Sequence, residues 1–163
     1  MTTFLKNRDM KFSFHLLLAC IALTACGESG KTTADYRIVP CPGEIAPGDG
    51  GDFELDARTR IVCTGDNDGM RANAEFLAGY VESVVGSAPE ITGPDGLCDD
   101  GRAVILRADA PGKGGEAYEI EVSENRITVS GESDAGVFYG IQTLRKAMGA
   151  AKAAKVLFPA VRI

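Results

Sequence analysis

The sequence is poor in two residue types on which many functional sites depend, histidine and tryptophan. It contains no tryptophan, and its single histidine, His15, lies in a stretch that we predict below to be removed. A mature chain without histidine excludes histidine-based catalytic triads and His-ligated metal sites. The lack of tryptophan weakens the case for a self-sufficient sugar-binding module, because such sites often use flat aromatic platforms.

Positive charge is also scarce. The 163 residues include 17 Lys and Arg against 23 Asp and Glu, which gives a net charge of −6. No basic stripe is visible along the sequence, and this argues against a nucleic-acid partner. Internal repeats are absent, and the length suits a single domain with a real hydrophobic core.

The first 25 residues predict a lipoprotein signal peptide. Lys6, Arg8 and Lys11 precede an apolar run over 12–23, which is too short for a comfortable membrane span. The run ends in Leu-Thr-Ala-Cys26, which matches a bacterial lipobox. In such a motif, small residues allow cleavage before the cysteine, whose sulfur then carries lipid. The alternative is an ordinary signal peptide with an incidental cysteine.

Lipidation of Cys26 predicts a chain in the cell envelope, anchored at the outer membrane or cell surface, or on the periplasmic face. Each buried lipid methylene adds about 0.8 kcal/mol, so several acyl chains would make the anchor permanent for practical purposes. We expect residues 26–35 to form a polar tether and residues 36–163 to form the domain. The sequence leaves open whether translation begins at Met1 or Met10.

Two motifs imitate ligand-binding loops. Residues 25–32 fit the loosest form of a phosphate-binding loop, but cleavage before Cys26 would cut through it and no helical pattern follows. Residues 64–69 with Glu75 resemble a calcium loop whose first ligand is replaced by Thr64. An EF-hand needs a preceding helix, whereas 53–63 looks extended. We therefore expect no nucleotide and no metal, and we expect Asp66 and Asp68 to cap the next helix.

The remaining cysteines and carboxylates do not predict catalysis. Cys41, Cys63 and Cys98 are left after lipidation, so one disulfide is possible and the spacing does not choose the pair. No histidine is available to activate a cysteine. The pairs Asp99–Asp100 and Glu119 with Glu121 favour a solvated surface over a glycosidase acid and nucleophile, because a working pair needs one carboxyl in a dry pocket. We expect no catalytic residue and no cofactor.

Hydrophobic spacing predicts two main helices and several strands. One helix covers Met70 to Val84 and ends at Gly86; the other is capped by Ser133 and Asp134 and ends at Gly149. Strands are expected at 36–39, 53–55, 61–63 and 103–106, with a hairpin over 118–129 and a loop over 152–163. This order predicts an α/β (α+β) sandwich, with two main helices packed on one mixed β-sheet.

Two glycines, Gly136 and Gly140, lie on one side of the second helix. Each costs about 1 kcal/mol in a helix interior relative to alanine. We therefore expect close packing of this helix against the sheet to offset that cost.

The same stretch resembles a known family. Ser130-Gly131, Asp134-Ala-Gly136, Phe138-Tyr-Gly140 and Gln142-Thr-Leu144 are similar to the end of the small domain that precedes the barrel in family 20 glycoside hydrolases, the β-N-acetylhexosaminidases. The terminal Phe-Pro-Ala-Val-Arg-Ile163 is similar to the link into that barrel. Accessory domains of α-glucuronidases and O-GlcNAc hydrolases share part of the helix pattern, and the terminal segment favours family 20. The resemblance covers 36–163.

The resemblance implies the zincin-like fold of the hexosaminidase N-terminal domain and a supporting role. The family removes terminal β-linked N-acetylglucosamine or N-acetylgalactosamine, with the substrate's own acetamido group as nucleophile. Its catalytic residues lie in the barrel, which the sequence up to Ile163 lacks, so we expect this chain to be inactive alone. The implied partners are a barrel in cis, to which Phe138 and Tyr139 are available, and a glycan through that barrel only. The alternative is a stand-alone surface lipoprotein that binds a glycan or a protein.

Overall fold

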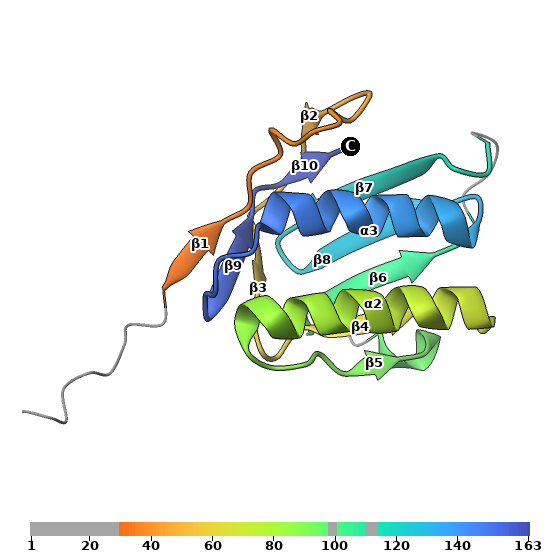
Figure 1. The fold of residues 1–163 in the computed structure, drawn as a ribbon, viewed down its shortest axis with the longest axis horizontal. Helices are drawn as coiled ribbons and strands as arrows, with labels where there is room; N and C mark the ends of the chain where they lie inside the picture. The colour runs from red at the N-terminus through yellow and green to blue at the C-terminus, as the bar shows by residue number, and fades with distance from the viewer. Residues whose placement is uncertain (1–29, 98–100, 110–113) are drawn as a thin grey trace, which may run out of the picture.

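The computed structural model describes residues 30–97, 101–109 and 114–163, and within them two mixed sheets accompany two long helices (Figure 1). The predicted α+β class, with two main helices packed on a mixed sheet, is confirmed. The elements in chain order are β1 Lys31–Thr33, β2 Ala46–Pro47, β3 Phe53–Leu55, β4 Arg60–Cys63, α2 Asp68–Val85, β5 Ile91–Thr92, the short 3₁₀ helix η2 Pro94–Gly96, β6 Ala103–Arg107, β7 Tyr118–Ser123, β8 Arg126–Gly131, α3 Asp134–Met148, β9 Lys155–Phe158 and β10 Val161–Arg162.

The larger sheet has seven strands in the order β2-β10-β7-β8-β6-β4-β5. Strands β4, β5, β6 and β8 are parallel, and β7 and β8 form the predicted antiparallel hairpin. Strand β6 is buried on both faces, as its continuous apolar run predicts: Val104 and Leu106 belong to the main core, while Ala103 and Ile105 join Val62 in a second, smaller cluster.

The two helices lie side by side on one face of this sheet and run in the same direction (Figure 1). The cap of α2 differs from the prediction: Asn67, not Asp66 or Asp68, accepts a hydrogen bond from the Met70 N–H at 2.8 Å, and Asp68 lies in the first turn. Asparagine is as good a cap as aspartate, so composition alone could not rank the three neighbours. The predicted ends at Gly86 and Gly149 are confirmed.

The smaller sheet is the part that sequence patterns missed. Its order is β1-β9-β3, with β1 parallel and β3 antiparallel to the central β9. The predicted strand over 36–39 is wrong, because the strand lies earlier, at Lys31–Thr33, within the expected tether. The predicted terminal loop over 152–163 is also wrong, because it contains β9 and β10.

The close approach predicted for α3 is confirmed at both glycines. A Cβ atom on Gly136 would collide with the backbone carbonyl oxygen of Ala117, and one on Gly140 would collide with the Val129 side chain. Helix α3 therefore lies directly on the β7–β8 hairpin because these two positions carry no side chain.

Candidate functional site

The outward faces of the two helices carry three exposed aromatic side chains. Phe76 of α2 and Phe138 and Tyr139 of α3 are 40%, 36% and 43% exposed. The ring centroids of Phe76 and Phe138 lie 5.5 Å apart, and those of Phe138 and Tyr139 lie 6.1 Å apart. These three residues form one contiguous surface, here called the aromatic patch.

The helical repeat explains why these rings face outward. In α3 the inward positions are taken by Gly136, Val137, Gly140 and Ile141, all buried, so Phe138 and Tyr139 fall on the opposite side. Aromatic residues left exposed together, rather than scattered singly, are typical of surfaces that contact another protein or domain.

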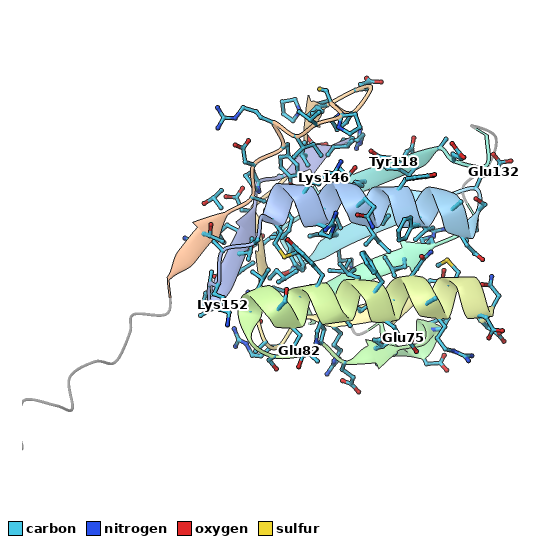
Figure 2. All side chains as sticks on the ribbon, viewed as in Figure 1. Glu75, Glu82, Tyr118, Glu132, Lys146 and Lys152 are labelled. Atoms are coloured by element: carbon cyan, nitrogen blue, oxygen red, sulfur yellow. The ribbon has the colours of Figure 1, made fainter. Side chains whose placement is uncertain are left out.

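The seam between the helices continues the patch toward their C-terminal ends. The Arg145 guanidinium lies 5.5 Å from the centre of the Tyr80 ring, and the Tyr80 hydroxyl donates to the Gly149 carbonyl at 2.7 Å. Glu75 and Glu82 lie on the edge of α2 that faces away from α3, and Lys146 lies on the opposite edge of α3, so charged side chains flank the helix pair on both sides (Figure 2). The helix face is thus an apolar strip within a charged surround, the usual layout of a polar-rimmed interface.

A cleft of about 310 Å³ runs along the other side of α3. One wall carries Tyr118, Tyr139 and Lys146, and the other is the segment 38–43. The Tyr118 hydroxyl lies 2.7 Å from Thr143 Oγ1, and Lys146 Nζ donates to the Val39 carbonyl at 2.7 Å, so the Tyr118 and Lys146 side chains already have partners.

A second cleft, of about 460 Å³, adjoins the first and contains several carboxylates. Glu44, Glu116 and Glu119 line it together with Arg162, and all four are exposed. A glycosidase acid needs a carboxyl held in a dry pocket. This cleft is open and charged, so its geometry does not provide such an acid.

The other residues singled out from the sequence stay apart from one another. Cys41 is exposed and Cys63 is buried, and both are free thiols. Glu121 pairs with Arg162 at 3.3 Å on the exposed face of β7. Cys26, Cys98 and Asp99–Asp100 lie outside the described residues.

The loop over 64–69 follows strand β4, as expected, rather than a helix. Its Asn67 side chain caps α2 and also donates to Asp134 Oδ1 at 3.3 Å, which joins the beginnings of the two helices. Across the described ranges, no group of three or more His, Cys, Asp or Glu side chains is arranged to hold a metal ion.

A charged network connects the smaller sheet to the start of β6. Arg102 spans two carboxylates, with Nη2 at 2.8 Å from Asp56 Oδ2 and Nη1 at 3.3 Å from Glu54 Oε1. Lys155 Nζ lies 2.8 Å from Glu54, and Arg58 lies 2.9 Å from Asp56. Burial raises the pKa of Asp56, but hydrogen bonds from Arg58 and the charge of Arg102 outweigh it, so the pKa falls below its usual value. The hydrogen bond from Lys155 lowers the pKa of Glu54.

Comparison with known proteins gives a consistent result. The family model described as glycosyl hydrolase family 20, domain 2, matches residues 35–163. A β-N-acetylhexosaminidase of Cellulomonas fimi is 27% identical over 129 residues, which cover 79% of this chain and 26% of that protein.

Solved structures agree with this match. The β-N-acetylhexosaminidase of Streptomyces coelicolor A3(2) shares the fold, with a TM-score of 0.63 and 21% identity over 78% of this chain and 26% of the other. A family 20 β-N-acetylglucosaminidase is 31% identical, with a TM-score of 0.55 over 79% of this chain and 22% of the other. This chain spans about a quarter of the length of these relatives. The chain therefore belongs to glycosyl hydrolase family 20, as the accessory domain that the family calls domain 2.

Proposed function

We propose that this chain is the non-catalytic accessory domain of a lipid-anchored β-N-acetylhexosaminidase, which removes terminal β-linked N-acetylglucosamine or N-acetylgalactosamine from glycans. Family membership and the named activities of the relatives support the parent activity. In this proposal the catalytic barrel belongs to the same polypeptide, and the glycan is bound only by the barrel.

The observation that carries the supporting role is the aromatic patch. The Phe138 ring contacts both Phe76 and Tyr139, yet all three side chains are more than a third exposed, on the face of the helices opposite the sheet. Covering such rings with a second domain is favourable, because apolar surface removed from water contributes about 25 cal/mol per Å². We assign the patch to the contact with the barrel.

The proposed anchor is the lipid on Cys26, and the proposed location is the cell envelope. The basic start, the short apolar run and the Leu-Thr-Ala-Cys26 tetrad support it. Among the described residues, no helix is both long enough and apolar enough to cross a membrane.

An enzymatic test addresses the supporting role. Residues 26–163 should leave a chromogenic N-acetylglucosaminide intact, whereas the protein encoded by the complete reading frame should cleave it. Turnover by residues 26–163 would overturn the proposal, and so would a stop codon after Ile163 with no hydrolase gene nearby. The latter result would favour the stand-alone lipoprotein.

The anchor has its own test. After membranes are washed with high salt, the Cys26→Ser protein should be absent from the membrane fraction, and labelled palmitate should enter the wild-type protein only. Retention of the variant in salt-washed membranes, or its labelling, would contradict lipidation at Cys26.

A further inference from the structure

The two ends of the domain carry opposite charge. At one end the helices finish, the parallel strands β4, β6 and β8 begin, and the smaller sheet lies across the core (Figure 1). Register places Arg60 and Arg126 beside Ala103, the neighbour of Arg102. We call this the basic end. Among the described residues, its lysines and arginines include Lys31, Arg58, Arg60, Arg102, Arg126, Lys152 and Lys155, and these outnumber the described carboxylates Glu54, Asp56, Glu82, Glu90 and Glu124.

The opposite end is acidic. There the helices begin and the parallel strands finish, and Figure 2 shows Glu132 at this end and Lys152 at the other. Arg71 and Arg107 are its described basic residues, and each pairs with a neighbouring aspartate. The carboxylates gathered there are Asp66, Asp68, Asp95, Asp109, Glu132 and Asp134. An acidic protein is thus polarised along its helix axes.

The start of the described chain is fixed at the basic end. The Ala154 N–H donates to the Gly30 carbonyl at 3.1 Å, and the Ala153 N–H donates to the Val84 carbonyl at 3.0 Å. Gly30 therefore lies between the end of α2 and the start of β9. Cys26 is four positions earlier, so even a fully extended connection reaches only about 14 Å.

Several cations at this end remain available to an external anion. Lys31 and Lys152 are exposed, and within the described ranges neither has a carboxylate partner. Arg58 keeps 76% of its side chain exposed although it pairs with Asp56. Ala150 and Ala151 are exposed beside Lys152, so the two residues that precede this lysine carry no charge.

We propose that the basic end is a docking surface for anionic phospholipid headgroups. Charge complementarity and the short reach from Cys26 to Gly30 both point to this occupant. Docked in this way, the helix axes stand away from the membrane and the aromatic patch faces sideways, where a barrel can sit without touching lipid. The cellular setting rests on the proposed anchor at Cys26, but the attraction to headgroups is a property of the domain and acts without the lipid.

Vesicle binding by the unlipidated mature chain tests the surface alone. Residues 26–163 with Cys26→Ser contain every element that the structure describes. At low salt we expect this protein to sediment with vesicles of phosphatidylcholine and phosphatidylglycerol, and not with phosphatidylcholine alone. Added salt should abolish the binding, because it screens exposed charges.

Paired variants locate the surface. Lys31→Gln with Lys152→Gln should weaken binding about 25-fold, since each basic residue near an anionic surface contributes about five-fold. The matched control, Arg71→Gln with Arg107→Gln, changes the net charge equally at the acidic end and should alter binding about two-fold or less. Circular dichroism should show both variants folded, because all four side chains are exposed.

The proposal would be overturned by no binding to the mixed vesicles, by equal binding to both kinds of vesicle, or by equal loss in the two double variants. The proposal would also be overturned if the domain bound an acidic polysaccharide or protein at a salt concentration that abolishes its binding to vesicles. That result would favour the polysaccharide or protein as the partner. If the domain does not bind vesicles but the wild-type protein is labelled by palmitate, the docking surface is refuted and the lipid anchor is supported. If the domain binds vesicles but the wild-type protein is not labelled, the anchor is refuted and the docking surface is supported.

Discussion

Both sheets of this domain place buried apolar side chains in the core, but their paired strands are separated by very different numbers of residues along the chain. In the seven-stranded sheet, β7 and β8 are joined by a tight turn, and β4 and β6 flank helix α2. In the three-stranded sheet, Lys31 pairs with Lys155 and Phe53 pairs with Phe158. The larger sheet is thus built largely from neighbouring elements, whereas the smaller one closes long loops, which costs chain entropy before any contact forms.

Despite its size, the smaller sheet belongs to the same hydrophobic core. Phe53, Leu55, Val156 and Phe158 are at most 1% exposed and belong to the main cluster with the helices and the larger sheet. The smaller sheet therefore closes the core at the basic end. The comparison predicts that a truncated core side chain in this sheet lowers the free energy of unfolding as much as one in the larger sheet.

The largest expected effect on stability comes from a core residue of the smaller sheet. Phe158→Ala should lower the free energy of unfolding by about 3–5 kcal/mol, because it deletes a fully buried aromatic side chain. Chemical denaturation measures the loss. Leu157→Ala, one residue earlier on the half-buried side of β9, is the matched control and should cost about 1 kcal/mol or less. Equal losses for the two variants would show that the smaller sheet is peripheral.

A smaller effect concerns the larger sheet, where α3 lies on the β7–β8 hairpin. Gly136→Ala should cost about 1–3 kcal/mol, because its Cβ would meet the Ala117 backbone, which cannot move aside freely. Gly79→Ala is the control, since nothing lies within 4 Å of the added carbon and Gly79 is in the interior of α2. It should stabilise the domain by about 0.5–1 kcal/mol. Thermal melting should therefore shift in opposite directions, and the same sign for both would contradict the close approach.

The smallest effect concerns the charged network that connects the two sheets. Asp56→Asn should cost about 1–2 kcal/mol near neutral pH, since it weakens the contacts with Arg58 and Arg102. The folded state lowers the pKa of Asp56, so its contribution is complete above the unfolded value of about 3.9 and is lost as the pH falls through the folded pKa.

The difference between wild type and Asp56→Asn should therefore shrink as unfolding is measured at decreasing pH below about 4. A difference that stays constant from neutral to strongly acidic pH would mean that the carboxylate charge contributes nothing. Arg107, whose partner Asp109 is exposed at the acidic end, offers a control: Asp109→Asn should change stability by about 1 kcal/mol or less.

The same contrast explains what the sequence could predict. Helices α2 and α3, the buried strand β6 and the β7–β8 hairpin each have a local period, and all four were predictable from it. Strands β1 and β9 are short, and they are strands because they pair with each other. Neither has an alternation of apolar and polar residues long enough to be recognised in the sequence. The segment 36–39 has the composition of a strand, but it pairs with none of the strands in the described part of the chain.

The aromatic patch and the basic end also differ in how far the sequence could predict them. Phe138 and Tyr139 could be recognised from one helix, but their contact with Phe76 depends on the packing of two helices. The basic end could not be recognised at all, because its residues are scattered from Lys31 to Lys155 and form no run. The parallel strands bring them together by starting at one edge.

The outermost strands of the larger sheet have a consequence for self-association. Both β2 and β5 are only two residues long, and β2 contains Pro47, which has no N–H to donate. Long, regular strand edges recruit further strands and seed aggregation, whereas short edges interrupted by proline resist it. The larger sheet therefore offers little backbone for another copy of the domain to extend, so its edges favour separate molecules even at high local concentration.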